Sequence, residues 1–349
     1  MGTQIALIKV GALGDVVRTT TLLPALRQLY PDMELTWISS KEALPLLRGN
    51  PDVTRAVAFD DPLSASWHHI DYDWMICLDD DRALCELASS LKSSRISGAY
   101  KSGDECRYTD DLAPWFDMGL LRPASQGGLK RANELKKDNR ETYGEVIYRG
   151  LGFSGPVARP FIKVPRAERQ AAEEWFKPRG LVRPIVGLNT GAGTRWRFKS
   201  WGENQSAELA RMIVDRLDAD VVVLGGASER ERNDRIVAAA KRRNVCVAPT
   251  DLSLLGFAAF IEQCNLLITS DSLGLHLATA LKKRIVAFFG PTSAAEIDLY
   301  GLGEKLSTPL ACATCYLRDC DVRPHCMDSI SVDQMFDAAA KHLVFSANP

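Results

Sequence analysis

The chain has 349 residues and a formal net charge of −1; 46% of its residues are hydrophobic and 25% are charged. This length accommodates about two domains, each with its own core. The near-zero charge gives no electrostatic reason to expect a nucleic-acid partner, and no apolar run approaches the length of a membrane span. We therefore expect a two-domain globular protein with no nucleic-acid partner and no membrane span. Peripheral contact with a membrane stays possible.

The first residues, MGTQIALIKVGALGD, lack the basic region, long apolar stretch and small-residue cleavage site of a secretory signal. We therefore expect a cytoplasmic protein. The nine cysteines, an odd number in a reducing compartment, argue against a disulfide framework.

Apolar, β-branched runs alternate with helical patterns through the first half of the chain, which predicts parallel α/β units. The predicted strands are residues 5–10, 34–39, 56–59 and 73–78. Leucines at near-helical spacing predict a helix from Val16 to Tyr30. Residues 100–142 are less regular, and the basic stretch at 130–140 is interleaved with acidic residues, as on a solvated helix face.

The alternation resumes after a helix predicted at 165–176. The further strands are predicted at 184–191, 221–226, 265–271 and 284–292, and a terminal helix at 332–344. We predict an α/β fold of two Rossmann-like domains facing a cleft. The domains are expected at 1–165 and 180–330, with a terminal segment, 331–349, that could return to the first.

A glycine loop, Gly11 to Asp15, lies between the first strand and the first helix, where ligands bind in open α/β sheets. Its spacing matches neither the dinucleotide fingerprint nor the P-loop. Asp15 could accept a proton from an attacking hydroxyl. Equally, it could simply cap the helix.

A second glycine loop, 191–195, is followed by Lys199. Its backbone N–H groups, the Thr194 hydroxyl and the Lys199 ammonium suit an anion such as a leaving diphosphate. A surface loop with solvated cations is the alternative.

The segment TSDSLGLH, 269–276, ends an apolar strand and enters a helix. Asp271 and Ser272 lie where first-turn N–H groups point outward, and His276 lies one turn deeper on the same face. These groups suit a diphosphate, unless Ser272 is only an N-cap and His276 only a packed side chain. Gly290 to Thr292 should begin another helix whose dipole could face the same anion.

Four cysteines fall within fifteen residues as C-x2-C-x4-C-x5-C: Cys312, Cys315, Cys320 and Cys326. Four thiolates at this density suit a tetrahedral zinc or iron ion with a structural role. His325 is a substitute ligand, and free thiols are the alternative.

Together these motifs resemble glycosyltransferase family 9, the ADP-heptose heptosyltransferases, over nearly the whole chain. The matching segments are IALIKVGALGDVVRTTTLLPAL, GAGTRWRFKSW, LGGASERE and ITSDSLGLHLATAL with FFGPT. The cysteine block CATCYLRDCDVRPHCM is similar to a segment found in part of the family.

The resemblance implies a glycosyltransferase-B fold with the acceptor on the first domain and the nucleotide-sugar donor on the second. It implies inversion at the anomeric carbon without a catalytic metal. Asp15 falls on the general-base position, Lys199 on the lysine that steadies the diphosphate, and His276 on the motif histidine.

The resemblance also places Asp271 near the donor sugar, Ser272 on a phosphate and Glu229 on the ribose. The donor-binding positions that we predict are Gly14, Thr194, Glu229, Asp271, Ser272, Leu273, Gly290 and Thr292.

Leu273 departs from the family pattern, because many lipopolysaccharide heptosyltransferases have glycine there. With leucine at this position, the chain resembles divergent branches of the family, including those similar to autotransporter heptosyltransferases. The expected acceptors are therefore a lipopolysaccharide core, a protein hydroxyl or a small molecule. Two other functions stay open: a nucleotide-sugar epimerase on the same fold, and a non-catalytic interaction module.

Overall fold

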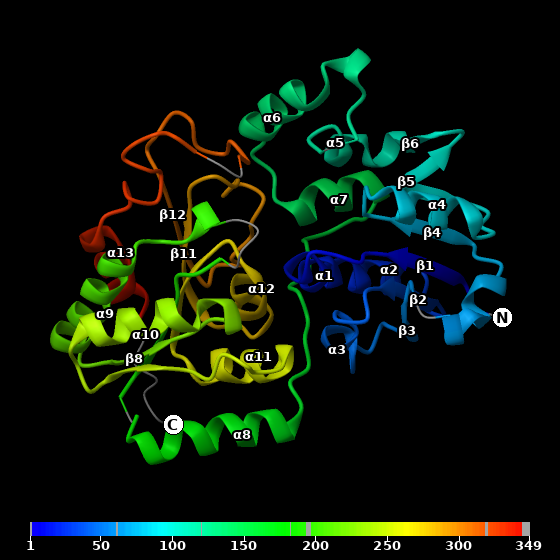
Figure 1. Ribbon diagram of the computed structural model, residues 1–349. Coiled ribbons are helices and arrows are strands. Elements are labelled where there is room, and N and C mark those ends of the chain that lie inside the picture. The colour runs from blue at the N-terminus through cyan, green and yellow to red at the C-terminus, as the bar shows by residue number, and fades with distance from the viewer. Residues whose placement is uncertain are drawn as a thin grey trace. The chain divides into compact units, whose positions relative to one another are not determined.

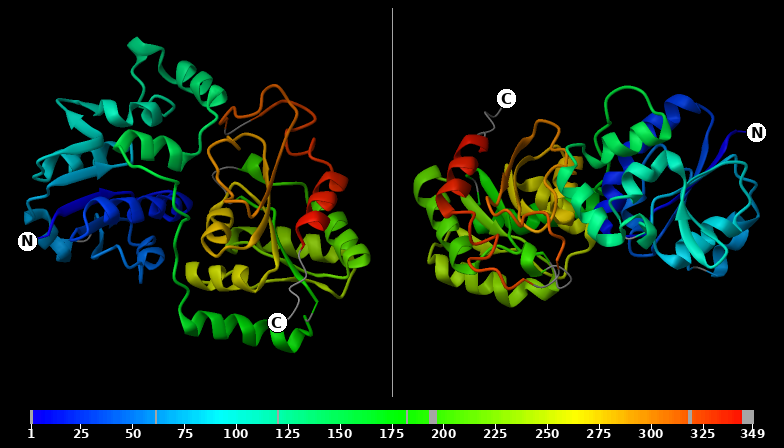
Figure 2. Two further views of the ribbon diagram at one scale, coloured as in Figure 1. Left: turned by 180° about the vertical axis from the view of Figure 1, so that it is seen from behind. Right: turned by 90° about the horizontal axis from the view of Figure 1, so that it is seen from above.

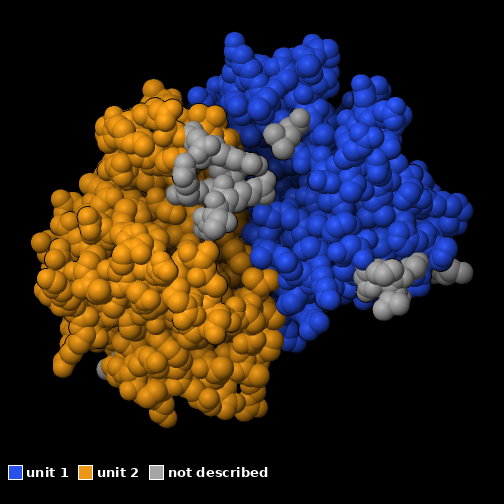
Figure 3. Space-filling model, in the orientation of Figure 1, with its two compact units in different colours: residues 1–163, 295–298 blue, residues 164–294, 299–349 orange. Residues whose placement is uncertain are grey.

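The computed structural model describes residues 2–60, 62–119, 121–181, 183–192, 197–317 and 320–343. The chain forms two compact units, which Figure 3 shows in different colours. Unit 1 comprises Met1–Lys163 and Ala295–Asp298, and unit 2 comprises Val164–Ala294 and Leu299–Pro349. The short segment Ala295–Asp298 therefore belongs to unit 1, although both its flanks belong to unit 2.

Unit 1 contains a six-stranded sheet in the order β3-β2-β1-β4-β5-β6. Its strands are β1 Gln4–Ile8, β2 Glu34–Ser39, β3 Arg55–Ala58, β4 Trp74–Cys77, β5 Ile96–Ser102 and β6 Glu105–Tyr108. All neighbours are parallel except β5 and β6, which form an antiparallel edge hairpin. The sequence did not predict this hairpin, because its edge strand, β6, has only four residues and two of them are charged.

The helices of unit 1 surround this sheet (Figure 1). They are α1 Leu13–Thr19, η1 Thr20–Leu22, α2 Leu23–Leu29, α3 Leu44–Leu47, η2 Pro62–His69, α4 Arg82–Ser90, η3 Asp110–Leu112, α5 Ala113–Phe116, η4 Ala124–Gln126, α6 Gly128–Asp138 and α7 Tyr143–Leu151.

The helix predicted from Val16 to Tyr30 is instead three consecutive pieces, α1, η1 and α2. The Thr20 hydroxyl donates to the Val17 carbonyl at 2.7 Å, which competes with the regular helical pattern. Pro24, in the first turn of α2, has no N–H to continue that pattern.

Unit 2 contains a six-stranded, fully parallel sheet in the order β12-β11-β10-β7-β8-β9. Its strands are β7 Ile185–Asn189, β8 Asp220–Val223, β9 Val245–Val247, β10 Leu266–Ser270, β11 Arg284–Phe289 and β12 Gly303–Ser307. Every residue of β7 and β10 is buried, as expected for central strands covered on both faces. The two Rossmann-like sheets confirm the predicted α/β fold class.

Two groups of helices cover the sheet of unit 2 (Figures 1 and 2). One group consists of α9 Glu203–Leu217, α10 Arg230–Ala240 and α13 Val332–His342. The other consists of α8 Arg166–Phe176, α11 Leu254–Gln263 and α12 Leu273–Ala280. Short 3-10 turns lie at η5 Lys177–Arg179, η6 Arg197–Lys199 and η7 Ala227–Glu229.

The terminal helix, α13, which the sequence suggested could return to the first domain, belongs to unit 2. Helix α13 packs on α9 and β11 within unit 2. Its buried face, Met335, Ala338 and Ala339, belongs to the hydrophobic core of that unit. The apolar face explains this position, because it can be covered by neighbouring elements of the same sheet.

In each sheet the winding direction reverses once, between β1 and β4 in unit 1 and between β7 and β10 in unit 2. The connections after these strands leave the sheet toward opposite faces, so ligands in α/β proteins bind at their carboxyl ends. Within the described residues, the helices are too short or too polar to cross a membrane.

Candidate functional site

A buried ion pair lies at the carboxyl ends of β1 and β4 in unit 1. The Lys9 ammonium, just after β1, contacts a carboxylate oxygen of Asp79, just after β4. Burial alone would lower the pKa of Lys9, but Asp79 and Asp15 raise it above its ordinary value. The pair therefore holds a charged lysine, with its counter-ion, where the winding of this sheet reverses.

Asp15 lies in the first turn of α1 and combines a capping contact with a place in this charge cluster. Its Oδ2 accepts a hydrogen bond from the Ala12 N–H at 3.3 Å and lies 3.9 Å from Lys9 Nζ. Its Oδ1 lies 3.0 Å from Arg18 Nε. The side chain is 31% exposed, so a ligand can still reach the carboxylate. Gly14 is buried in the same turn.

Arg18 fixes the Asp15 carboxylate from the other side and was not singled out from the sequence. Its guanidinium lies 4.1 Å above the Tyr143 ring and 5.4 Å from the Trp115 ring, measured to the centroids. Its Nη1 lies 4.0 Å from Glu296 Oε2, in the segment Ala295–Asp298. Its i,i+3 spacing from Asp15 is the sequence signal that could have identified Arg18. Its aromatic partners are remote in sequence and gave no such signal.

A second charge cluster lies at the carboxyl end of β10 in unit 2. Lys199 Nζ donates to Asp271 Oδ2 at 2.8 Å and to the Asp271 carbonyl at 3.2 Å. His276 Nε2 lies 3.9 Å from Asp271 Oδ1. Burial would raise the pKa of Asp271, but Lys199 and His276, with a smaller contribution from Thr292, hold it at about 2. The structure thus brings three predicted residues together around one buried carboxylate.

Ser272 occupies the N-cap position of α12, but in the described structure its side chain makes no capping hydrogen bond to that helix. Its hydroxyl instead accepts a hydrogen bond from Asn189 Nδ2 at 3.0 Å. Leu273 is half-buried in the first turn of α12. Capping therefore does not explain the serine at this position.

Glu229 lies at the end of η7, and its Oε2 accepts a hydrogen bond from the Gly226 N–H at 2.9 Å. A side chain at Gly191 would collide with the Glu229 carboxylate, so the glycine makes room for it. The Gly191 carbonyl accepts a hydrogen bond from Ser270 Oγ at 3.0 Å, which joins this loop to β10. Thr194, the other predicted residue of the loop, lies outside the described residues.

Residues 290–292, predicted to begin a helix, form a bend after β11 instead. The Gly290 and Pro291 carbonyls accept hydrogen bonds from the backbone of Thr314, at 3.1 Å, and Tyr316, at 2.9 Å. These bonds hold the bend against the cysteine loop, 312–326. A Cβ at Gly290 would lie 2.6 Å from Cys326 Sγ, so glycine permits this close packing.

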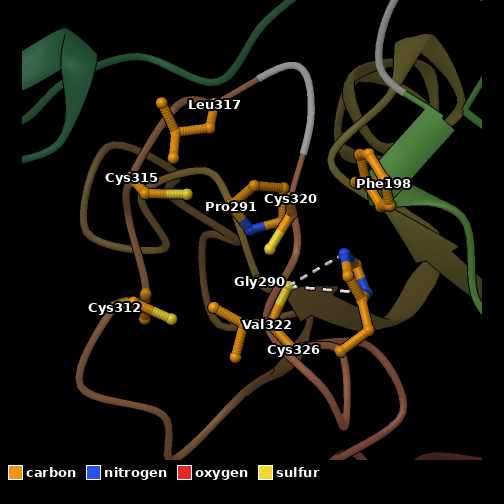
Figure 4. Close-up of a pocket in the computed structure, with 11 residues that line it drawn as sticks. Phe198, Gly290, Pro291, Cys312, Cys315, Leu317, Cys320, Val322 and Cys326 are labelled. Carbon is orange, nitrogen blue, oxygen red and sulfur yellow. Dashed lines mark hydrogen bonds between the residues drawn. The ribbon is translucent and has the colours of Figure 1, made fainter.

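The four cysteines of this loop line one pocket together with Phe198, Leu317 and Val322. Figure 4 shows the side chains of Cys312 and Cys315 pointing toward those of Cys320 and Cys326. Burial raises the pKa of Cys326 to about 11, and the other three thiols add to the rise. Across the described residues, no three His, Cys, Asp or Glu side chains are close enough together to hold a metal.

His325, the substitute ligand, is engaged elsewhere in the loop. Its Nδ1 accepts a hydrogen bond from the Met327 N–H at 3.2 Å. Its ring stacks on Phe198, with 4.7 Å between the centroids. These contacts favour Cys326 over His325 as the fourth donor.

Comparison with known proteins gives the family of the chain. Residues 87–323 match the model of glycosyltransferase family 9 (heptosyltransferase). Lipopolysaccharide heptosyltransferase 1 of Pseudomonas aeruginosa is 33% identical over 342 residues, which cover 92% of this chain and 88% of that protein. The chain belongs to glycosyltransferase family 9.

Two solved structures share the fold of this family 9 chain. A family 9 glycosyltransferase from Veillonella parvula has a TM-score of 0.77 at 20% identity, covering 98% of this chain and 97% of that one. The dodecameric iron-containing heptosyltransferase TibC of enterotoxigenic Escherichia coli, in complex with ADP-D-β-D-heptose, has a TM-score of 0.55 at 12% identity. That match covers 98% of this chain and 76% of TibC.

Family membership makes the chain a glycosyltransferase, as predicted. It decides against the non-catalytic module and the epimerase. Both charge clusters of this glycosyltransferase lie at the positions where α/β sheets bind ligands.

The charge pair in unit 2 predicts a specific dependence of stability on pH. Because the folded-state pKa of Asp271 lies near 2, below its ordinary value of 3.8, the carboxylate stabilises the fold above about pH 4. This contribution is lost as the pH falls through about 2. Asp271→Asn should therefore lower the free energy of unfolding by about 2 kcal/mol near neutral pH, and the difference should vanish at about pH 2.

Urea titrations of both proteins across this pH range measure the difference. Asp251→Asn, at an exposed aspartate of the same unit, is the control and should change little at any pH. A loss for Asp271→Asn that is constant from neutral pH down to about pH 2 would contradict the ion-pair account.

Proposed function

We propose that this glycosyltransferase moves a heptose or related sugar from ADP-heptose, or a similar nucleotide sugar, to an acceptor hydroxyl with inversion. The observation that carries the proposal is the Lys199–Asp271–His276 cluster at the carboxyl end of β10. The ADP-heptose bound to TibC supports the donor class. The name of the Pseudomonas relative favours a lipopolysaccharide-core sugar among the expected acceptors.

In unit 2, Lys199 would neutralise the charge that grows on the leaving diphosphate. Its ion pair with Asp271 holds the ammonium in place before the donor arrives, so little reorganisation is needed. Ser272 would donate a hydrogen bond to a phosphate oxygen, and Glu229 would contact the ribose. No catalytic metal is needed in this scheme.

In unit 1, Asp15 would act as the general base. The acceptor oxygen attacks the anomeric carbon while its proton passes to an Asp15 carboxylate oxygen. The bond from the anomeric carbon to the diphosphate breaks on the opposite face, and the diphosphate leaves with the electron pair. Lys9 and Arg18 favour the ionised carboxylate, which is the form that accepts a proton.

We propose a cytoplasmic location as well. The nine cysteines, all within the described residues, form no disulfide in the structure, which agrees with a reducing compartment.

Asp15→Asn separates the base from the capping role. Asparagine keeps the size of the side chain and can still accept the Ala12 hydrogen bond. If Asp15 is the base, turnover should fall by about a hundred- to ten-thousandfold, with near-normal folding and nucleotide affinity. Melting temperature, ADP affinity and transfer rate measured on one preparation check this.

Asp32→Asn, at an exposed aspartate of the same unit, is the matched control and should transfer at the parental rate. Transfer at that rate by Asp15→Asn would remove Asp15 from the mechanism and leave it with the capping role alone.

We further propose that the four loop cysteines hold one structural zinc or iron ion. Soft thiolates are the donors that these metals take in structural sites. The four side chains line one pocket, and they would have to move closer together to bind one ion. The iron in TibC supports a metal at this fold. Because the loop holds the bend at Gly290 and Pro291, the ion would stabilise the end of the donor site.

Elemental analysis should therefore find about one zinc or iron ion per chain. Cys315→Ser should lower metal content and thermal stability together, because the free energy of ligation contributes to folding. Cys246→Ser, at a half-buried cysteine of β9, should leave the metal content unchanged. Full stability of a metal-free parent protein would overturn this proposal.

A further inference from the structure

We propose that Asn189 is a positioning residue that orients the Ser272 hydroxyl as a hydrogen-bond donor toward the diphosphate of a nucleotide sugar. The inference rests on the proposed function, because it deepens the description of the same donor site. Asn189 is the last residue of β7, and it pairs in register with Thr269 of β10. It therefore lies at the carboxyl end of the strand pair, β7 and β10, at which the winding of the sheet reverses.

The two N–H groups of the Asn189 amide each have a hydroxyl partner. Nδ2 donates to Thr269 Oγ1 at 2.9 Å and to Ser272 Oγ at 3.0 Å. Asn189 is 5% exposed and Thr269 is fully buried, so water does not compete strongly for these bonds. The amide is thus a rigid bridge from the strand to the first residue before α12.

The direction of the hydrogen bonds in this network follows from the number of protons. Thr269 Oγ1 donates its one proton to the Ser270 carbonyl at 3.0 Å, so it accepts from Asn189. Ser272 Oγ accepts the other amide N–H. The Ser272 proton can be shared with Thr269, 3.2 Å away, or can turn to an incoming anion. Asn189 therefore fixes the oxygen and leaves the proton for the ligand.

A glycine makes this approach of the amide possible. A Cβ at Gly274 would lie 2.6 Å from Asn189 Nδ2, a distance that side-chain carbons do not adopt. The absence of a side chain at Gly274 therefore lets the Asn189 amide reach Ser272.

The test is a double-mutant cycle on ADP affinity, measured by calorimetry with the full chain. Ser272→Ala and Asn189→Leu should each weaken ADP binding by roughly tenfold or more, as expected for a lost hydrogen bond to a charged group. If Asn189 acts through Ser272, Asn189→Leu should cause little further loss in the Ser272→Ala background. If Asn189 has only a structural role, the losses of ADP affinity from the two single variants should multiply in the double variant.

Two further variants complete the experiment. Gly274→Ala keeps Asn189 but displaces its amide, so it should weaken ADP binding like Asn189→Leu, even if the latter folds poorly. Asn265→Leu is the matched control, because Asn265 also bridges these strands, accepting from the Ile185 N–H at 2.8 Å at their amino ends. It should leave ADP affinity unchanged.

The outcomes separate this inference from the proposed function. Failure of the parent chain to bind ADP would overturn both. Suppose instead that the parent chain binds ADP and that Ser272→Ala weakens this binding. If the effects of Asn189→Leu and Gly274→Ala are then independent of the effect of Ser272→Ala, only the role of Asn189 is overturned.

Discussion

A doubly wound parallel sheet must change its direction of winding between two neighbouring strands, and the site in each unit depends on this constraint. At the reversal, successive connections leave toward opposite faces, so polar side chains can gather at the strand ends without a covering loop. In unit 1 the strands are β1 and β4, and Lys9 and Asp79 lie just beyond their carboxyl ends. In unit 2 they are β7 and β10, which end at Asn189 and Ser270.

The two units use these positions for different chemistry. Unit 1 places two cations, Lys9 and Arg18, beside one partly exposed carboxylate, Asp15. Unit 2 has a less exposed carboxylate, Asp271, whose side chain is 18% exposed and which holds a cation, Lys199. A solvated lysine would lose side-chain entropy when an anion binds, whereas this lysine is already ordered. In the proposed mechanism, Asp271 would thereby contribute to anion binding without contacting the anion.

Features set by local sequence were predicted well, and features set by long-range contacts were not. β2 has its predicted bounds, 34–39, because an apolar run between turn residues is a local signal. Lys199, Asp271 and His276, each predicted from a local motif, lie together in the structure. Arg18 over Tyr143 and Asn189 beside Ser272 were missed, since they join segments more than eighty residues apart in the chain. Glu296, beside Arg18, was missed for the same reason, because its short segment belongs to unit 1 although both its flanks belong to unit 2.

Hydrogen–deuterium exchange with and without ADP tests most directly whether the diphosphate binds where β7 and β10 end. The account predicts that ADP slows exchange of the backbone amides at 271–276, because first-turn N–H groups of α12 would bind the phosphates. Exchange in the β5–β6 hairpin should not change. Protection confined to segments outside 271–276, with ADP bound, would contradict the account.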